Sequence, residues 1–199
     1  MTSGTLKRAK RRIRREVLAI RDGLPPSERS AMGELVSERF LTLPEVMGAR
    51  SVMLFWSFGS EVPTERVIQR LHARGVVVAL PRIEGSELVA VGYAPGDPSE
   101  TTAFGAEEPL RGARIPRATL DVVAIPAVAF DRRCGRIGYG GGYYDRFLRG
   151  LRAFTAGLSF GLQVLDEELP TGNFDRRVDA IVTESETIRC FDLNSRSGS

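Results

Sequence analysis

The stretch SVMLFWSFGSEVPTERVIQRLHARGVVVALP, residues 51–81, contains two compact apolar runs separated by an amphipathic segment. The runs at 51–58 and 76–81 predict two buried strands. Between them, Thr64 can cap a helix that ends at Gly75. A strand, a helix and a second strand in this order predict two parallel strands joined by a right-handed crossover.

Apolar runs and helical patterns continue on both sides of this unit. We expect further strands at 87–93, 121–130, 154–160 and 178–184, and helices at 6–22 and 27–43, the second capped by Ser27. Residues 94–119 hold several prolines and glycines and predict a long irregular connection. Buried strands that alternate with helices predict an α/β fold, here a three-layer sandwich with a largely parallel sheet.

The 199 residues suffice for one domain that buries a core without metal or disulfide support. We expect a single domain over residues 1–190 and a flexible C-terminal tail over 191–199. No run approaches the roughly 18 apolar residues that span a bilayer, and no secretory signal is recognisable. The composition therefore predicts a soluble protein with no membrane partner.

Cysteine and histidine are scarce. Cys134 and Cys190 do not form a disulfide framework, so a reducing cytoplasm is the default expectation. The single histidine, His72, lies in a predicted amphipathic helix, which makes a zinc site or a Ser-His-Asp triad difficult to build. Chemistry is expected to rest on carboxylates, lysine or arginine, tyrosine and backbone amides, with or without a bound metal.

The net charge of +3 is unevenly distributed. Residues 7–15 contain seven lysines and arginines and no acidic residue, and the rest of the chain is net acidic. Apolar residues recur through this segment at three- and four-residue steps, which predicts an amphipathic helix. A basic helix on an otherwise acidic chain predicts an anionic partner bound at one place.

A second distinctive stretch is GRIGYGGGYYDRFL, residues 135–148, which follows a predicted strand and leads into a helix. Ligands of open α/β sheets bind beyond the carboxyl ends of strands. The glycines allow backbone amides to approach a phosphate closely, and Arg136 can pair with its oxygens. The alternative is a tight turn in which the glycines only supply positive φ angles. The stretch matches neither G-x-x-x-x-G-K-[ST] nor G-x-G-x-x-G.

Residues 136–145 read RIGYGGGYYD and resemble the R-[LI]-G-x-G-x-G-[YF]-Y-D signature of the 5-formyltetrahydrofolate cyclo-ligase (methenyltetrahydrofolate synthetase) family. The Gly-Gly-Gly form of the loop resembles bacterial members. Other features follow in the family's order: Lys10 with Arg14, Glu61 in SEVPT, Pro81-Arg82, the segment from Phe104-Gly105 to Pro109, and Asp175. The resemblance covers nearly the whole chain, and it implies a fold like that of ribose-phosphate isomerase and the CoA-transferases.

The resemblance implies an ATP- and Mg²⁺-dependent ligase that converts 5-formyltetrahydrofolate to 5,10-methenyltetrahydrofolate. In that reaction the formyl oxygen attacks the γ-phosphate, N10 attacks the resulting imino-phosphate, and phosphate leaves, with ADP as the other product. Such a site positions phosphates and offers the pterin an apolar wall, and it needs no protein nucleophile.

The resemblance also implies nucleotide contacts from the basic helix and the glycine stretch. Lys10 and Arg14 are four residues apart and share one helix face, although a solvated basic face is the alternative. The implied nucleotide-binding residues are Lys10, Arg14, Arg136, Ile137, Gly138, Tyr139, Gly140, Gly141, Gly142, Tyr143 and Tyr144, of which Lys10, Arg136 and Tyr144 are the candidate catalytic residues.

Two acids are the implied Mg²⁺ ligands, Asp145 and Asp175. Asp145 is alternatively a partner of the helix dipole, and Phe174 stands before Asp175 where the family often has histidine. The implied substrate contacts are Trp56, Glu61, Phe104 and Tyr143, with Glu61 accepting from pterin N–H groups. The alternative for Glu61 is an ordinary acidic residue in a loop. For Trp56 and Phe104 it is packing in the core, and for Tyr143 it is packing at the start of a helix.

Two other functions remain open from the sequence. One is a related ATP-dependent enzyme with a different substrate. The other is a nucleic-acid-binding module that uses residues 7–15, since seven cations in nine residues can follow phosphates. No base-stacking motif accompanies that segment, so we expect a small-molecule substrate, no nucleic acid and a cytoplasmic monomer.

Overall fold

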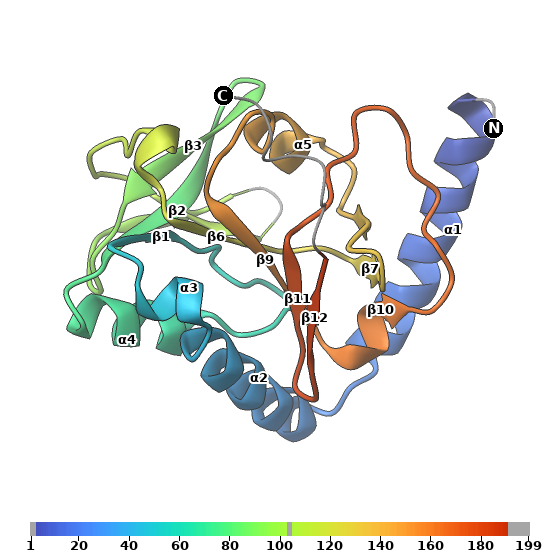
Figure 1. Ribbon diagram of the computed structural model, residues 1–199, viewed down its shortest axis with the longest axis horizontal. Helices are drawn as coiled ribbons and strands as arrows, with labels where there is room; N and C mark the ends of the chain where they lie inside the picture. The colour runs from blue at the N-terminus through green and yellow to red at the C-terminus, as the bar shows by residue number, and fades with distance from the viewer. Residues whose placement is uncertain (1–2, 103–104, 191–199) are drawn as a thin grey trace.

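The computed structural model describes residues 3–102 and 105–190. Its centre is a seven-stranded sheet in the order β12-β11-β9-β6-β1-β2-β3 (Figure 1). The strands are β1 (Ser51–Met53), β2 (Val77–Glu84), β3 (Glu87–Gly92), β6 (Val122–Ile125), β9 (Phe154–Leu158), β11 (Ala180–Val182) and β12 (Thr187–Arg189). The five inner strands pair in parallel, and the edge strands β3 and β12 are antiparallel. The predicted α/β fold with a largely parallel sheet is confirmed.

Different elements cover the two faces of this sheet, because successive side chains of a strand point to opposite faces. Val52 of β1 packs in the core that includes Phe40 of α2 (Pro26–Leu41) and Leu71 of α4 (Glu65–Ala73). Its neighbour Met53 packs instead with Phe147 of α5 (Tyr143–Phe147). Figure 1 shows α2, α4 and the short α3 (Pro44–Met47) below the sheet and α5 above it.

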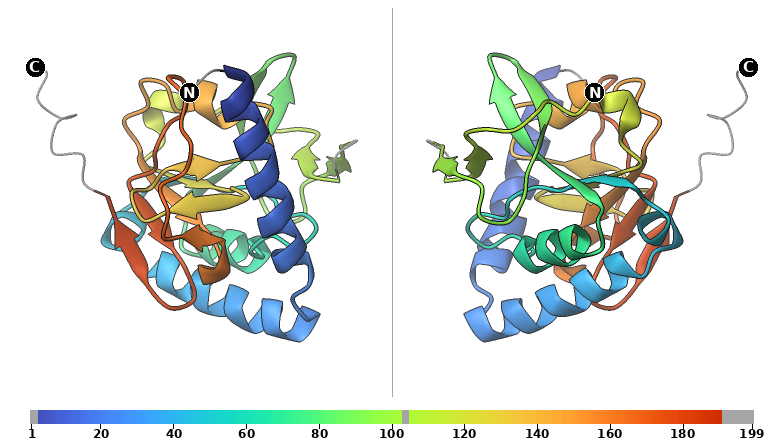
Figure 2. Two further views of the ribbon diagram at one scale, coloured as in Figure 1. Left: turned by 90° about the vertical axis from the view of Figure 1, so that its right-hand side faces the viewer. Right: turned by 90° about the vertical axis from the view of Figure 1, so that its left-hand side faces the viewer.

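A smaller sheet supports the N-terminal helix. Its order is β10-β7-β8, with β7 (Ala129–Asp131), β8 (Arg136–Ile137) and β10 (Val164–Leu165). Helix α1 (Ser3–Asp22) lies across it (Figure 2), and Val17 packs with Val128 and Ile137. Val17 is therefore buried against the small sheet, with Ile13 and Leu18 partly buried beside it. The remaining elements are β4 (Ser99–Thr101), β5 (Glu107–Pro109) and the 3₁₀ turns η1 (Arg117–Thr119) and η2 (Gly161–Gln163).

The apolar run 121–130, predicted as one strand, forms two strands in different sheets. β6 ends at Ile125 in the central sheet, and β7 begins at Ala129 in the small one. Pro126 follows β6 and has no amide hydrogen to continue a ladder. The Gln163 amide donates to the carbonyls of Ala127 and Val128, both at 3.0 Å, and so satisfies backbone between the two strands. The glycine stretch consequently begins in the small sheet, with β8 at its start.

Two predicted caps and one strand boundary are wrong. α2 begins at Pro26, so Ser27 lies inside the helix. Thr64 precedes α4 but makes no side-chain capping bond. Its hydroxyl instead donates to the Phe55 carbonyl at 2.6 Å and accepts from the Ser57 amide at 3.2 Å. These bonds hold the segment that leaves the sheet after Met53, which is why the strand predicted to continue to residue 58 ends early.

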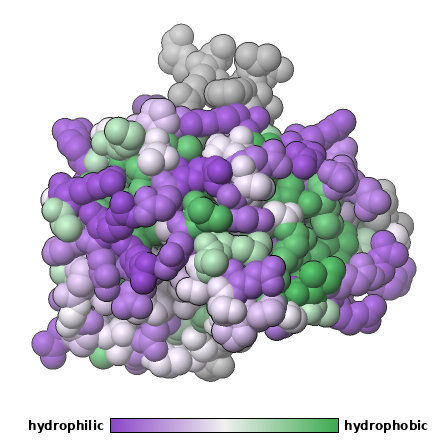
Figure 3. Space-filling model, turned by 90° about the horizontal axis from the view of Figure 1, so that it is seen from below, coloured by the Kyte–Doolittle hydropathy of each residue, from purple (hydrophilic) through white to green (hydrophobic). Residues whose placement is uncertain are grey.

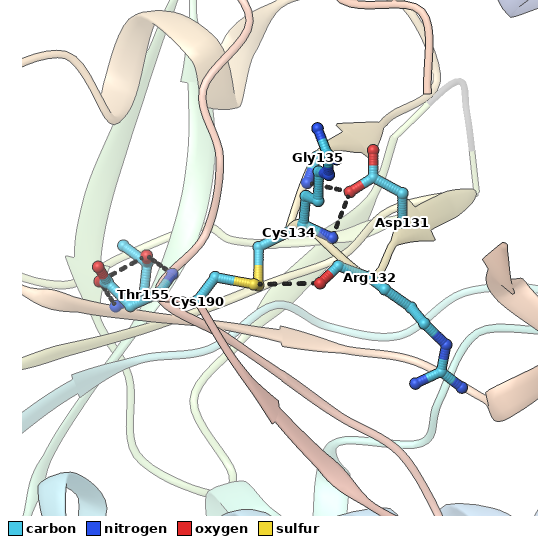
Figure 4. Close-up of a disulfide and its surroundings, with 8 residues drawn as sticks. Asp131, Arg132, Cys134, Gly135, Thr155 and Cys190 are labelled. Atoms are coloured by element: carbon cyan, nitrogen blue, oxygen red, sulfur yellow. Dashed lines mark hydrogen bonds between the residues drawn. A yellow bond between two sulfur atoms is a disulfide. The ribbon is translucent and has the colours of Figure 1, made fainter. Parts of the chain in front are cut away.

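The expectation that the cysteines form no disulfide is also wrong. Cys134 and Cys190 are joined, with their Cα atoms 6.0 Å apart (Figure 4). β12, which the sequence pattern does not predict, returns antiparallel along β11 and brings Cys190 to the turn after β7. The Cys134 carbonyl also accepts from the Val178 amide at 3.1 Å. The C-terminal end of the described chain is thus tied to the residue that precedes the glycine stretch.

The surface of the described residues is largely hydrophilic when viewed from below, with a hydrophobic area toward the side on which α1 lies (Figure 3). Exposed large apolar side chains include Ile20 of α1 and Leu35 of α2. In the part of the chain that the structure describes, no helix has the length and apolar character needed to cross a bilayer.

Candidate active site

A cavity of about 490 Å³ lies next to the ends of β1 and β6. Five parts of the chain line it: residues 55, 56, 58 and 61 after β1, the β2–β3 hairpin, residues 102 and 106–108, residue 126 after β6, and residues between 136 and 145 of the glycine stretch and α5. This is the edge of an open α/β sheet at which ligands bind. The cavity has one end rich in charge and another end at which aromatic rings lie beside the carboxylate of Glu61, and Glu107 and Glu108 also line it.

Glycine is required at several positions of the loop. Gly140 and Gly142 have φ angles of 110° and 68°, which side chains with a Cβ rarely adopt. A Cβ on Gly141 would lie 2.7 Å from the ring of Tyr143. Within the described chain, the amides of residues 139–142 donate no hydrogen bond. The loop is thus both a strained turn and a row of available donors, so the two interpretations of the sequence are compatible.

Three basic residues of α1 face this region from one side of the helix. Arg14 Nε donates to the Gly138 carbonyl at 2.6 Å, and burial lowers the pKa of Arg14. Lys10 forms an ion pair with Asp175, and Arg21 Nη2 donates to the Tyr139 hydroxyl at 2.9 Å. The C-terminal half of α1 therefore contacts the loop through Arg14 and Arg21, whereas Lys10 contacts Asp175.

Arg136 and Asp145 form a second ion pair, at the cavity wall. Arg136 Nη2 donates to Asp145 Oδ1 at 2.6 Å, and the Arg136 side chain is only 3% exposed. Burial lowers the pKa of Arg136, and Asp145 opposes that shift. Two buried polar atoms here, Arg136 Nε and the Tyr144 hydroxyl, have no hydrogen-bond partner in the described structure. Burial also raises the pKa of Tyr144, so its hydroxyl remains a donor.

Of the two predicted metal ligands, Asp145 lines the cavity and Asp175 lies outside its lining, but the chain beside Asp175 contacts Asp145. The amide of Arg176, next to Asp175, donates to Asp145 Oδ1 at 3.2 Å. Asp175 Oδ2 accepts from Lys10 and from the Gly172 amide, which leaves its Oδ1 and Asp145 Oδ2 without a hydrogen bond to described residues. The described residues contain no cluster of three or more possible ligands. Two carboxylate oxygens fit Mg²⁺, which commonly completes its shell with water and substrate phosphates.

At the other end, Glu61 is buried, with 5% of its surface exposed. Its Oε1 accepts from the Tyr139 hydroxyl at 3.0 Å, and its Oε2 accepts from the Phe58 amide at 3.2 Å. Burial raises the pKa of Glu61 to about 7. The ring of Phe58 stacks at 5.2 Å on Tyr139, and Trp56 meets Tyr93 edge-on at 5.6 Å. The result is an aromatic pocket around one carboxylate acceptor.

With this geometry the comparison with known proteins is direct. The model of the 5-formyltetrahydrofolate cyclo-ligase family matches residues 6–184. The chain belongs to the 5-formyltetrahydrofolate cyclo-ligase family. Its members are ligases, so the chain is an enzyme of that class.

Named relatives of this family are similar over most of their length. The 5-formyltetrahydrofolate cyclo-ligases of Escherichia coli (strain K12) and Haemophilus influenzae are each 32% identical over 174 residues, which is 83% of this chain and 95% and 92% of theirs. The NMR structure of Aquifex aeolicus 5,10-methenyltetrahydrofolate synthetase matches with a TM-score of 0.82 at 32% identity, over 96% of both chains. The Mycoplasma pneumoniae synthetase shares the fold, with a TM-score of 0.72 at 20% identity over 88% of this chain and 98% of its own.

Most residues that the cyclo-ligase signature assigns to the site line the cavity: Trp56, Glu61, Arg136, Gly138, Tyr139, Gly141, Gly142, Tyr143, Tyr144 and Asp145. Lys10, Arg14, Ile137, Gly140 and Asp175 are outside its lining, and the Ile137 side chain packs under α1. Phe104 lies outside the described residues.

The residues of the cyclo-ligase cavity region that sequence reasoning did not assign include Arg21 and Phe58. Arg21 stands seven positions after Arg14 and thus on the same helix face, a spacing that was available in the sequence. Phe58 ends the apolar run 51–58, which was predicted as one continuous strand. No local sequence signal distinguishes it from an aromatic residue of the core.

Proposed function

We propose that this enzyme converts 5-formyltetrahydrofolate and ATP to 5,10-methenyltetrahydrofolate, ADP and phosphate, with Mg²⁺ as the metal. One observation carries the proposal: a single cavity combines a buried carboxylate acceptor with unpartnered buried donors beside a glycine loop. The first suits a ring that offers N–H groups, and the second suits phosphate oxygens. Membership of the cyclo-ligase family supports the pairing of these two ligands.

In this proposal the pterin occupies the aromatic end. The Glu61 carboxylate accepts from pterin N–H groups, and Trp56 and Phe58 supply apolar contact. The ring is neutral, so its recognition depends on an ionised acceptor in a dry pocket rather than on opposite charge.

The triphosphate occupies the charged end. The free amides of residues 139–142, Arg136 Nε and the Tyr144 hydroxyl supply donors to its oxygens. Lys10 and Arg14 add positive charge from α1. Asp145 and Asp175 would hold Mg²⁺, which when bound neutralises charge on the phosphates during transfer.

The chemistry needs positioning more than a protein nucleophile. The formyl oxygen of the substrate attacks the γ-phosphorus and the bond to the ADP oxygen breaks, which gives an imino-phosphate and ADP. N10 then attacks the formyl carbon and gives its proton to the phosphate group, and the carbon–oxygen bond breaks as this phosphate leaves. Arg136 and Tyr144 donate hydrogen bonds that stabilise the transferring phosphoryl oxygens.

The proposal has the enzyme act as a monomer in the cytoplasm. A size measurement of the purified protein in solution tests the monomer. Retention of activity in a dithiol reductant tests whether the enzyme works under the conditions of a reducing compartment, where a disulfide such as Cys134–Cys190 is uncommon.

The direct test is to mix purified protein with 5-formyltetrahydrofolate, Mg²⁺ and ATP and to follow methenyltetrahydrofolate by absorbance and phosphate by a coupled assay. We expect equal amounts of both products and none when ATP is omitted. Absence of methenyltetrahydrofolate at any enzyme concentration would refute the proposal, and ATP hydrolysis without it would indicate a different substrate.

A further inference from the structure

We propose that Arg21 is a positioning residue of the folate pocket, which acts through Tyr139 to keep Glu61 an ionised, acceptor-only group. The inference rests on the proposed function, because it deepens the role of Glu61 in that reaction. Arg21 is a buried cation, and its side chain contacts Ser60 and Tyr139 near the pocket.

Arg21 lies in the last turn of α1 and is only 3% exposed. A buried guanidinium is costly unless its donors are used. Nε donates to Ser60 Oγ at 2.8 Å, and Nη2 donates to the Tyr139 hydroxyl at 2.9 Å. Ser60 in turn donates to Asp22. Arg21 thus joins α1 to both the segment that carries Glu61 and the glycine loop.

The chemistry of these donors fixes the direction of the next hydrogen bond. A guanidinium has no acceptor, so the Tyr139 oxygen must accept from Arg21. The single phenolic proton is then free for Glu61 Oε1, 3.0 Å away. The Phe58 amide donates to Oε2. Both oxygens of Glu61 therefore accept a hydrogen bond. A carboxylate accepts at both oxygens, whereas a protonated acid carries a proton on one oxygen that it must donate.

The groups around Glu61 also favour its ionised form. Burial raises the pKa of Glu61 to about 7, and the Phe58 amide, the Arg21 charge and the Tyr139 hydroxyl all oppose that rise. The other titratable group that interacts with it is Tyr144 of α5. Burial raises the pKa of Tyr139 to about 12 and that of Tyr144 as well, so both phenols stay neutral near pH 7. Without Arg21, Glu61 would hold its proton to higher pH.

The competing explanation is that Arg21 only fastens α1 to the body of the protein. Three variants separate the two explanations. Arg21→Met removes charge and donors, Arg21→Lys keeps the charge and one donor, and Ser60→Ala removes the Nε contact while the charge stays. If Arg21 only fastens α1, Ser60→Ala and Arg21→Met should change KM and kcat in a similar way. If Arg21 positions Glu61, the kinetics of Ser60→Ala should resemble those of the parent enzyme.

The experiment measures KM for each substrate and kcat from pH 5.5 to 8.5. For Arg21→Met we expect KM for 5-formyltetrahydrofolate to rise about tenfold, the loss typical of a hydrogen bond to a charged group, with KM for ATP unchanged. The acid limb of kcat/KM should move to higher pH, and Arg21→Lys should move it back. Equal losses in both KM values and in kcat, or an unmoved acid limb, would overturn the proposal.

A readout independent of activity is the titration of the Glu61 side-chain carboxyl, followed by NMR in protein labelled with ¹³C-glutamate and assigned with Glu61→Gln. We expect its midpoint to be about one pH unit or more higher in Arg21→Met than in the parent protein. An unchanged midpoint contradicts the inference even if the enzyme is active. A raised midpoint in a protein without cyclo-ligase activity would instead place the error in the proposed function. If Arg21→Met does not fold, Tyr139→Phe removes the same relay and serves in its place.

Discussion

The two ends of the cavity handle charge in opposite ways. At the charged end, Arg136 pairs directly with Asp145, and next to it Lys10 pairs with Asp175. At the aromatic end, Glu61 forms no ion pair with a described residue, and the Arg21 guanidinium is linked to it through the Tyr139 hydroxyl. Direct pairs can exchange partners with a phosphate and a metal when these bind. A lone carboxylate surrounded by neutral donors stays available for a neutral ring.

The largest test of this contrast removes one member of a direct pair. Asp145→Asn keeps the shape but loses the charge that faces Arg136 and the proposed metal. We expect kcat/KM to fall about 100-fold or more, in line with the loss of one transition-state stabilising group. The matched control is Asp166→Asn, because Asp166 also pairs with an arginine but is 89% exposed. Equal activity of the two variants would remove Asp145 from the site.

The next test targets the lone carboxylate. Glu61→Gln should raise KM for 5-formyltetrahydrofolate about tenfold to 100-fold, since it replaces a charged acceptor. It should also abolish the acid limb, because burial raises the pKa of Glu61 to about 7 and this carboxyl therefore loses its proton in that range. Steady-state kinetics across pH check both outcomes, and an acid limb that persists in the variant would assign it to another group.

The same substitution should stabilise the fold. The folded pKa of Glu61, about 7, lies above its ordinary value of 4.5, so the folded state binds the extra proton between these values. Stability therefore falls as pH rises through that window. At pH 8, Glu61→Gln should gain about 1–3 kcal/mol in the free energy of unfolding. Urea unfolding at pH 8 and pH 4.5 checks this, and no gain at pH 8 would mean that Glu61 is not strained by its burial.

A smaller effect is expected from the cations of α1. Lys10→Met should raise KM for ATP about tenfold, because it removes one charged donor beside the proposed phosphate site. Lys7→Met is the matched control, since Lys7 is exposed on the same helix, and it should change KM for ATP by less than about twofold if screening governs exposed charges. An equal rise of KM for ATP in both variants would indicate that the positive charge of α1 as a whole attracts ATP, and not a local contact of Lys10.

The smallest effect on catalysis is expected from the disulfide that anchors the start of the loop. Cys190→Ala should lower the free energy of unfolding by about 2–4 kcal/mol, since the bridge closes a long loop in the unfolded chain. We expect kcat/KM to change by less than about twofold at a temperature at which the variant is folded. A tenfold loss of activity without a stability change would show that the charged end depends on this anchor.

Much of the fold could be predicted because the central strands carry continuous apolar runs. The unit from β1 through α4 to β2 follows from residues 51–81 alone. The break at Pro126 could not be predicted, since the run continues on both sides and the side chain that stabilises it, Gln163, is distant in sequence. The same holds for β12 and the disulfide, whose partners meet only after the sheet forms.

The site divides in the same manner. Helix spacing places Lys10 and Arg14 on one face, and the glycine motif marks the loop. The pairing of Lys10 with Asp175 joins residues 165 positions apart, and no local pattern carries it. The contacts of Arg21 are similarly long-range, so the helix face was predictable while its partners were not.

Residues 122–131 connect the central sheet to the small sheet, and this connection affects the affinity of the glycine loop for its ligand. The glycine stretch begins at Gly135, four residues after the end of β7, and the turn between them is fixed by buried Asp131, whose carboxylate accepts from the amides of Gly135 and Leu169. The loop is therefore held by the packed interior on its N-terminal side. Conformational entropy that a loose loop would lose on meeting its ligand is lost here during folding, so more of the contact energy is retained as affinity.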